Sequence, residues 1–216
     1  MAKKIGVVGS GTVGRTLADG FLKHGHEVMV GSREPAKLAE WQAKAGAKGS
    51  VGSFQAAAAF GEIVVVTVRG QVAEAVVKSF PPGVLDGKTV IDTCNPIGTQ
   101  PPVNGVLNFF TGPNESLHEK LQALAPAAHF VKAFSCVGSA SMVNPDFGGV
   151  KPTMFLCGND AKAKQEVTAI LTQFGWEWED MGGAEAARAI EPLCILWCIP
   201  GLRGGSWSHA FKLLKK

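Results

Sequence analysis

The hydrophobic positions of the chain fall into short continuous runs, and longer segments with helical spacing separate these runs. The runs are "IGVVG", "EVMVG", "IVVVTV", "TVIDT", "HFVKAF" and "TMFLCG". Several are apolar at consecutive positions, which is typical of strands covered on both faces in a parallel sheet. The alternation of such strands with helices predicts a doubly wound α/β fold with a parallel sheet.

The first two segments between the runs have the features of crossover helices. The segment "RTLADGFLKHG" places Leu17, Phe21 and Leu22 on one face and stops at Gly25. The segment "PAKLAEWQAKAG" has a proline near its first turn and ends at a glycine, as helices commonly do. We therefore expect one helix in each segment.

From about residue 150 the pattern becomes mainly helical. We expect Asp160 to cap a helix over "AKAKQEVTAILTQFG", and two further helices over "AEAARAIEPLCILWCIPG" and "SWSHAFKLLKK", separated by Pro200 and three glycines. The prediction is one compact unit, in which residues 1–150 form the main domain and residues 151–216 form a small helical lobe packed on it.

Composition and charge narrow the classes of partner. The 216 residues are 46% hydrophobic and carry a net charge of only +3, with no basic stripe, so nucleic acid is not expected as a partner. The five cysteines form no CxxC pair, which predicts reduced thiols in or near the core and no metal site. The apolar run near the N-terminus is too short for a signal peptide or a membrane span, so we expect a cytoplasmic protein without a membrane partner.

The stretch "GSGTVG" places Gly9, Gly11 and Gly14 in the GxGxxG spacing between the first strand and the first helix. In this motif the first glycine allows a tight turn, the second lets a pyrophosphate approach the backbone, and the third lets the helix pack closely on its strand. Free N–H groups at the start of the helix then hold the anion. We predict that residues 1–150 form a Rossmann-type domain that binds a dinucleotide.

The end of the second strand indicates which dinucleotide is bound. A carboxylate in this place accepts hydrogen bonds from a ribose 2′-hydroxyl and repels a 2′-phosphate, but here the chain has Gly31, Ser32 and Arg33. Ser32, Arg33 and Lys37 together offer a hydroxyl and two cations. This set favours NADP(H) over NAD(H), whereas the alternative is that both cations are solvated residues at a helix start.

Ligands of open α/β sheets bind beyond the carboxyl ends of the strands, and no strong acid or base is expected there. Three histidines (His24, His26 and His129) precede strands and should lie at the opposite end. His118 and His209 fall in predicted helices without an obvious carboxylate partner, so we predict no catalytic acid or base. The residues that follow the strands on the binding side are mostly neutral: Thr67, Val68, Arg69, Thr93, Cys94, Asn95, Pro96, Ser135, Cys136 and the stretch 138–141. Such a set suits hydride transfer between aligned rings.

The helix expected after residue 184 contains further candidates that we interpret as structural. Arg188 and Glu191 lie three residues apart and are expected to form a surface pair. Trp197 belongs to an apolar stripe, and Cys194 and Cys198 share a helix face without a histidine. We expect these three side chains to pack in the core.

Four longer stretches of the chain resemble a known protein family. The stretches "KIGVVGSGTVGRTLADGFLKHGHEVMVGSREPAK", "VIDTCNP", "VKAFSCVGSASM" and "EDMGGAEAARAIEPLCILW" resemble the NADP oxidoreductases dependent on the deazaflavin coenzyme F-420. The cytosolic domain of the six-transmembrane metalloreductases belongs to the same wider group. The resemblance covers nearly the whole chain and implies a Rossmann domain with a small C-terminal lobe, together with hydride transfer between NADPH and a ring acceptor.

The resemblance also implies roles for individual residues. It implies pyrophosphate contacts at Ser10, Thr12 and Val13, 2′-phosphate contacts at the serine, arginine and lysine named above, and nicotinamide contacts at Ser139 and Ala140. The full set of expected cofactor contacts is Gly9, Ser10, Gly11, Thr12, Val13, Gly14, Ser32, Arg33, Lys37, Val68, Arg69, Asn95, Pro96, Ser139 and Ala140. Because relatives are commonly dimers, a homodimer is expected.

One departure from the sequence pattern of the family leaves the identity of the hydride acceptor open. The last strand of the archaeal deazaflavin enzymes leads into "HTIPAA", whereas here it leads into "SCVGSA". We expect a deazaflavin such as coenzyme F-420, or a flavin, to stack near Ser139, Ala140 and the long loop over residues 98–113. The alternatives are a non-catalytic NADP(H)-sensing module and an imine or ferric-chelate reductase.

Overall fold

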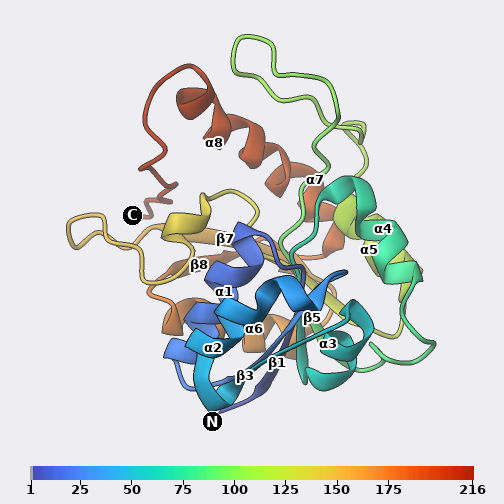
Figure 1. The fold of residues 1–216 in the computed structure, drawn as a ribbon. Helices are drawn as coiled ribbons and strands as arrows, with labels where there is room; N and C mark the ends of the chain where they lie inside the picture. Colours follow the sequence, from blue (N-terminus) through green and yellow to red (C-terminus); the bar gives the residue numbers. More distant parts are fainter. Residues whose placement is uncertain (1) are drawn as a thin grey trace.

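A computed structural model describes residues 2–216 and contains one eight-stranded sheet between two layers of helices (Figure 1). The spatial order of the strands is β3-β2-β1-β4-β5-β6-β7-β8, and the first six are parallel. The order 3-2-1-4-5-6 is that of dinucleotide-binding α/β folds, so the predicted fold class is confirmed. The strands are β1 Lys4–Val8, β2 Glu27–Gly31, β3 Gly49–Gly52, β4 Ile63–Val66, β5 Thr89–Asp92, β6 His129–Lys132, β7 Thr153–Gly158 and β8 Glu177–Asp180.

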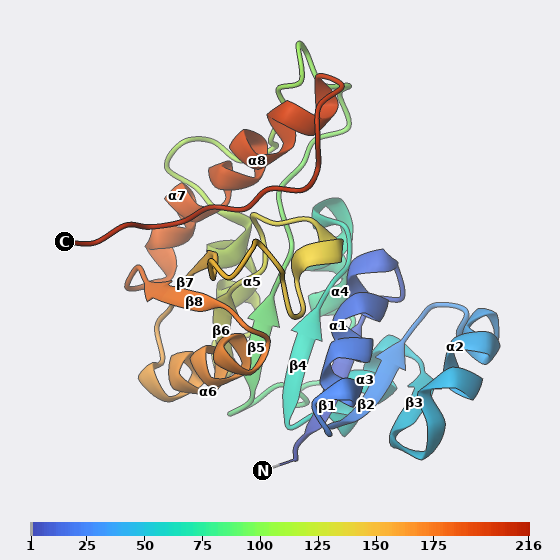
Figure 2. The same cartoon turned by 90° about the vertical axis from the view of Figure 1, so that its left-hand side faces the viewer.

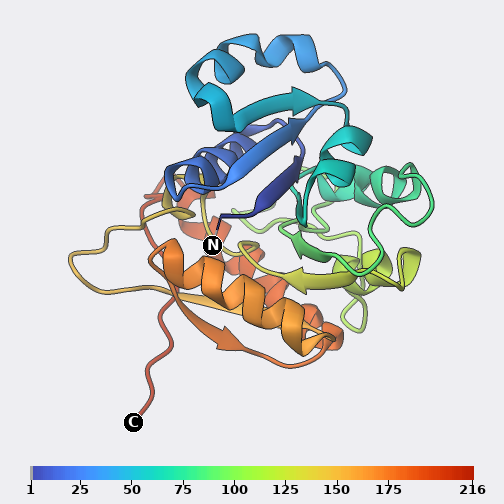
Figure 3. The ribbon, with the colours of Figure 1, turned by 90° about the horizontal axis from the view of Figure 1, so that it is seen from below.

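Helices cover both faces of this sheet (Figure 3). Phe21 of α1 and Leu171 of α6 pack with Val7 on one face, whereas Val76 of α4 and Leu121 of α5 belong to the cluster on the other face. The central strands are therefore buried on both sides, which explains their continuous apolar runs. The helices are α1 Thr12–Lys23, α2 Ala39–Ala45, α3 Phe54–Phe60, α4 Gly70–Lys78, α5 Leu117–Leu124, α6 Ala161–Gln173, α7 Ala187–Ile190 and α8 Pro192–Leu202.

The C-terminal region contains the expected helices α6, α7 and α8, but it also extends the sheet. Strand β7 pairs antiparallel with β6, with Cys157 opposite Lys132, and β8 pairs parallel with β7. Strand β8 reads "EWED" and lies at the edge of the sheet with little burial. Because an exposed edge strand needs no apolar run, the hydrophobic pattern did not mark β8 as a strand.

Two helices expected from the sequence differ in the structure. Residues 206–216 form no helix but an extended tail, in which the carbonyl of Phe211 accepts a 2.8 Å hydrogen bond from the backbone N–H of Thr153. Segment 35–46 divides into a 3-10 turn, Pro35–Leu38, and the short helix α2, which buries no side chain. Pro200 lies inside α8 and does not end it.

The parallel strands point toward α8 and the loop over residues 95–114 (Figure 2). This loop is a narrow hairpin, in which Val103 pairs with Val106 and left-handed backbone at Asn104 and Gly105 makes the turn. A Cβ atom added to Gly105 would lie 2.6 Å from the side chain of Arg203, so the hairpin packs closely on the end of α8. Loop and helix together form a wall above the carboxyl ends of the strands.

Candidate functional site

The glycine turn between β1 and α1 has the geometry that the motif requires. Gly9 has a φ of 127°, which favours glycine, and a Cβ atom on Gly14 would lie 2.1 Å from the carbonyl oxygen of Gly9. The hydroxyl of Thr67, after β4, donates to the carbonyls of Val8 and Gly9 at 3.1 and 3.2 Å. The turn is therefore held against the neighbouring strand.

The start of α1 is open toward a ligand. A Cβ atom on Gly11 would meet nothing within 4 Å, no side chain caps the helix, and its first turn contains no acidic residue. The N–H groups of this turn thus carry the partial positive charge of the helix N-terminus without a carboxylate to neutralise it. This cradle fits the pyrophosphate of a dinucleotide, which the Rossmann fold binds at the same place.

The end of β2 lies beside the glycine turn. The hydroxyl of Ser32 is 3.1 Å from that of Ser10 and accepts a hydrogen bond from the backbone N–H of Glu34. Arg33 and Lys37 extend from the same segment into solvent, and Lys37 forms an exposed ion pair with Glu34 at 2.7 Å. Such a pair contributes about 0–1 kcal/mol, so Lys37 can turn toward a phosphate at little cost. The roles of these residues in binding a 2′-phosphate stay predictions.

A hollow of about 340 Å³ lies at the carboxyl ends of β4 and β5. It brings together four of the predicted cofactor contacts: Val13, Val68, Arg69 and Asn95. Among the described residues that line it there is no histidine and no carboxylate, and Arg69 carries the one charge. The remaining lining residues are Thr67, Gly70, Gln71, Thr93, Cys94 and Ile97.

The predicted nicotinamide contacts Ser139 and Ala140 lie in a 3-10 turn, Ser139–Ser141, that packs against α1. The turn also meets α8, because a Cβ atom on Gly138 would lie 2.6 Å from the ring of Trp197. Trp197 is only 7% exposed, as expected for a core residue, and its indole N–H donates to the carbonyl of His209 at 2.8 Å. Trp197 therefore supports the turn from behind.

Pro96 is buried at the base of the hairpin, where its carbonyl accepts a hydrogen bond from the backbone of Phe110. Asn95, just before it, donates from its side chain to the carbonyl of Ser135 at 2.7 Å. This bond joins the turn after β5 to the turn after β6. The position of Asn95 is thus tied to the segment that leads to Ser139 and Ala140.

A cluster of buried charged side chains lies beneath the carboxyl ends of the strands, and it shows that two predictions from the sequence were wrong. His118 does have a carboxylate partner, because its Nδ1 lies 3.0 Å from Oδ2 of Asp92. Lys132 Nζ lies 3.1 Å from the same oxygen and 2.9 Å from Oε1 of Glu191. Each of the four side chains is at most 1% exposed. Glu191 is therefore not a surface residue, and Arg188 instead forms an exposed pair with Glu119 at 2.6 Å.

Burial and ion pairing shift the pKa values of Asp92 and Lys132 in opposite directions. Burial opposes ionisation of Asp92, but the attraction of Lys132 outweighs it and holds the pKa of the carboxyl well below its usual range. Burial likewise disfavours the charged form of Lys132, yet Asp92 and Glu191 raise its pKa above the ordinary value. The lysine and the aspartate are thus both charged at neutral pH.

The sequence contains a signal for this cluster. Lys132 is a charged residue in the run "HFVKAF", and Asp92 is one in "TVIDT". A charged side chain in a strand that is covered on both faces needs an oppositely charged partner, because an unpaired buried charge is energetically costly. Since the two strands are neighbours in the sheet, these residues were candidates for partners. Glu191 could not be found in this way, because it lies about 60 residues further along the chain.

The remaining histidines and the cysteines offer no nucleophile or base at the site. His26 is buried at the amino-terminal side and contacts Gln173, whereas His209 lies in the extended tail and stacks on Trp197 at 4.9 Å. The cysteines are free thiols, as expected, and only Cys198 is partly exposed. Burial raises the pKa of Cys136 to about 12, which makes it a poor nucleophile. Within residues 2–216 no three His, Cys, Asp or Glu side chains are grouped to hold a metal ion.

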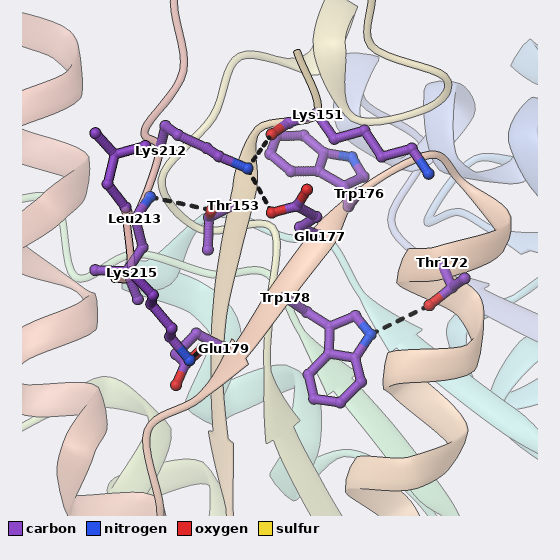
Figure 4. Close-up of a pocket in the computed structure, with 11 residues that line it drawn as sticks. Lys151, Thr153, Thr172, Trp176, Glu177, Trp178, Glu179, Lys212, Leu213 and Lys215 are labelled. Carbon is purple, nitrogen blue, oxygen red and sulfur yellow. Dashed lines mark hydrogen bonds and ion pairs between the residues drawn. The ribbon is translucent and has the colours of Figure 1, made fainter. Parts of the chain in front are cut away.

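A larger groove of about 600 Å³ lies beside the edge strand β8, between this strand and the C-terminal tail (Figure 4). Lys212 and Lys215 of the tail pair with Glu177 and Glu179 of β8, so four of the charges that line the groove are already paired. The groove contains no residue of the glycine turn or of the expected cofactor set. We therefore assign the hollow beside the glycine turn as the candidate site.

Comparison with known proteins places this geometry in a family. Residues 4–96, which include the glycine turn and the end of β2, match the sequence model of the family described as NADP oxidoreductase, coenzyme F-420-dependent. A protein from Arthrobacter sp. FB24 with a known crystal structure, provisionally described as an F-420-dependent NADP reductase, is 31% identical to this chain in sequence. The alignment covers 99% of this chain and 100% of that protein, with a TM-score of 0.91.

Two further similarities concern longer proteins. Metalloreductase STEAP3 of Rattus norvegicus is 29% identical over 206 residues, which are 93% of this chain but 39% of that protein. The chain therefore spans about two fifths of the length of this curated relative. An imine reductase from Aspergillus terreus, solved with a reduced form of NADP, is 19% identical, with a TM-score of 0.67 over 94% of this chain and 63% of that protein. This last similarity shows a shared fold.

None of the described helices is long and apolar enough to span a bilayer.

Proposed function

Since the chain belongs to the family of coenzyme F-420-dependent NADP oxidoreductases, we propose that it transfers a hydride between NADPH and a ring acceptor, either a deazaflavin such as coenzyme F-420 or a flavin. The observation that carries the proposal is the contact between the glycine turn and the end of β2. Ser10 and Ser32 meet there at 3.1 Å, with Arg33 and Lys37 beside them and an uncapped helix start on the other side.

In this proposal the chain holds the cofactor at both ends. The N–H groups at the start of α1 bind the pyrophosphate, and Ser32, Arg33 and Lys37 bind the 2′-phosphate. Val68, Arg69 and Asn95 line the hollow that receives the nicotinamide end. NADPH supplies a hydride at its nicotinamide ring, and the protein contributes mainly proximity and alignment of the two rings.

The chemistry of the hollow favours a ring acceptor over an imine. Reduction of an imine gives an amine nitrogen that needs a proton, so an acid near the nicotinamide is an advantage. The part of the hollow that the structure describes has neither a carboxylate nor a histidine, and the chain contains no tyrosine. A deazaflavin or flavin ring can accept a hydride with the negative charge delocalised over the ring. A ferric chelate stays an alternative acceptor, because a metalloreductase is among the similar proteins.

The experiment is a screen for acceptors. The purified protein is mixed with NADPH and, separately, with coenzyme F-420, FMN, FAD, a cyclic imine and ferric citrate, and oxidation of NADPH is followed at 340 nm. We expect turnover with the deazaflavin or a flavin and none with the imine. Tight binding of NADPH without oxidation by any acceptor in the panel would contradict the proposal.

That last outcome would favour the second candidate, a non-catalytic NADP(H)-sensing module. The observation behind it is the contact of Trp197 with Gly138, through which α8 can respond to a ligand at the turn that follows β6. A sensor would change hydrogen exchange in α8 and in the hairpin when NADPH replaces NADP⁺. Equal exchange in both states would contradict sensing.

We also propose that the chain forms a homodimer through α8. This helix has apolar side chains on all sides, yet Leu196 is 55% exposed and Leu202 is 38% exposed. A helix that is apolar all round is normally covered all round. Light scattering should give twice the mass of one chain for the wild type and the mass of one chain for Leu196→Glu. A cytoplasmic location stays a prediction of the sequence.

A further inference from the structure

The buried cluster of Asp92, His118, Lys132 and Glu191 joins four separate elements beneath the nicotinamide end of the hollow. Asp92 ends β5, Lys132 ends β6, His118 lies in the first turn of α5, and Glu191 lies between α7 and α8. All four side chains are withdrawn from solvent. No step of the proposed hydride transfer uses them, and paired charges buried in this way add little net stability compared with apolar residues.

Lys132 is the centre of this cluster. Its ammonium group donates to Oδ2 of Asp92 at 3.1 Å, to Oε1 of Glu191 at 2.9 Å, and to the backbone carbonyl of Cys94. These three bonds use all the N–H donors of a lysine. The third bond matters most here, because Cys94 and the next residue, Asn95, line the hollow.

Glu191 extends the connection to the helices. Its carboxylate accepts the backbone N–H groups of Leu117 and His118 at the start of α5, each at 3.0 Å. The same carboxylate holds Lys132. The position of the ammonium, and so of the Cys94 carbonyl, therefore depends on a residue at the start of α8.

The turn that Lys132 holds is closely connected to the residues around it. The side chain of Asn95 donates to the carbonyl of Ser135, and a Cβ atom on Gly70 would lie 2.0 Å from the backbone oxygen of Asn95. The backbone N–H of Cys94 donates to Oδ1 of Asp92 at 2.9 Å. Because Cys94 is bonded directly to the cluster, a change there should move one edge of the hollow and leave the glycine turn between β1 and α1 in place.

We propose that Lys132 and Glu191 are positioning residues for the nicotinamide end of the cofactor. They hold the backbone at Cys94 and Asn95 against the nicotinamide and do not affect the phosphate end. The inference rests on the proposed function in one respect, namely that the chain binds NADPH. It does not depend on the identity of the acceptor.

The test compares two ligands by titration calorimetry: NADPH, and 2′-phospho-ADP-ribose, which has the same phosphates but no nicotinamide. The variant is Glu191→Gln, which removes the charge and keeps one hydrogen-bond acceptor. The matched control is Glu119→Gln, because Glu119 with Arg188 forms the exposed connection between the same helices, α5 and α7. We expect Glu191→Gln to weaken NADPH about tenfold, which is about 1.4 kcal/mol, and to change the affinity for 2′-phospho-ADP-ribose less than twofold. The control should leave both affinities unchanged.

The other possible results would contradict the proposal in distinguishable ways. Equal loss of both ligands in Glu191→Gln would mean that the cluster stabilises the whole fold, and unchanged binding of both would mean that it does not reach the hollow. If the wild type binds neither ligand, the proposed function itself is wrong, and the inference with it. Should circular dichroism show that Glu191→Gln is unfolded, Glu191→Asp, which keeps the charge on a shorter side chain, is measured with the same expectation.

Discussion

The hydroxyl groups of Ser10 and Ser32 lie 3.1 Å apart, although 22 residues separate them in the chain. The contact brings the glycine turn and the end of β2 to one place, where the strand pairing of Val8 with Gly31 has already aligned them. A ligand with a pyrophosphate and a second phosphate nearby can therefore contact both segments.

Arg33→Asp should weaken the binding of NADPH far more than that of NADH. The variant removes a cation that can bind the 2′-phosphate through two N–H groups and puts a repelling carboxylate in its place. We expect a loss of roughly 10- to 100-fold for NADPH, since a hydrogen bond to a charged group contributes about 1.5–3 kcal/mol. Fluorescence titration with both nucleotides measures it, with Lys44→Asp on α2 as the control. If both nucleotides weaken equally, Arg33 does not bind the phosphate.

Gly14→Ala and Gly11→Ala should separate folding from binding. A Cβ atom on Gly14 would lie 2.1 Å from a backbone oxygen, so Gly14→Ala should lower the free energy of unfolding by about 1–3 kcal/mol. Gly11→Ala places its methyl group in open space and should unfold like the wild type, while its affinity for NADPH falls. Urea unfolding and nucleotide titration test the pair. Unchanged NADPH affinity in Gly11→Ala would refute the pyrophosphate site.

Gly138→Ala should impair hydride transfer with little effect on NADPH binding at the phosphate end. The added methyl group would meet the ring of Trp197 at 2.6 Å and push the turn of Ser139 and Ala140 away from α8. We expect kcat to fall at least about tenfold, because a displacement of about 1 Å can cost 100-fold in rate. Lys44→Ala, an exposed change on α2, is the control. A normal kcat in Gly138→Ala would exclude this turn from the site.

The charge of Asp92 should make stability depend on acid pH. The folded pKa of Asp92 is depressed, so its contribution is complete above the unfolded value of about 4 and is lost as pH falls below it. Asp92→Asn should therefore cost about 3 kcal/mol at pH 7, and its stability should fall less steeply than that of the wild type between pH 5 and pH 3. Urea unfolding at several pH values measures both, with exposed Asp86→Asn as the control. Parallel pH profiles of wild type and Asp92→Asn would contradict this account.

Lys132 makes the opposite contribution at high pH. Its folded pKa is raised, so its contribution is complete below the unfolded value of about 10.4 and disappears only as pH rises through the folded value. Between these limits the pair of Asp92 and Lys132 is fully charged. The nicotinamide end of the hollow should therefore keep its shape across the neutral range.

The sequence by itself determined the central part of the fold. Five parallel strands were visible because a strand covered on both faces must be apolar at consecutive positions, and the glycine spacing marked the turn that follows the first of them. Local chemistry also fixed the cap of α6, where the carboxylate of Asp160 accepts the N–H of Ala163 at 2.7 Å. Such features depend on neighbours within a few residues, so they can be recognised along the chain.

The tertiary structure alone decided what distant residues do. Strand β8 is polar because it lies at an edge, and the extended tail of residues 206–216 is hydrogen-bonded to Thr153 of β7, so neither follows the local pattern. Glu191 has the spacing of a surface partner for Arg188, but the buried charge of Lys132, 59 positions away, needs a second carboxylate. A buried charge is paired wherever the fold brings an opposite charge within reach, and only the packing of α5, α7 and α8 on the sheet determines that partner.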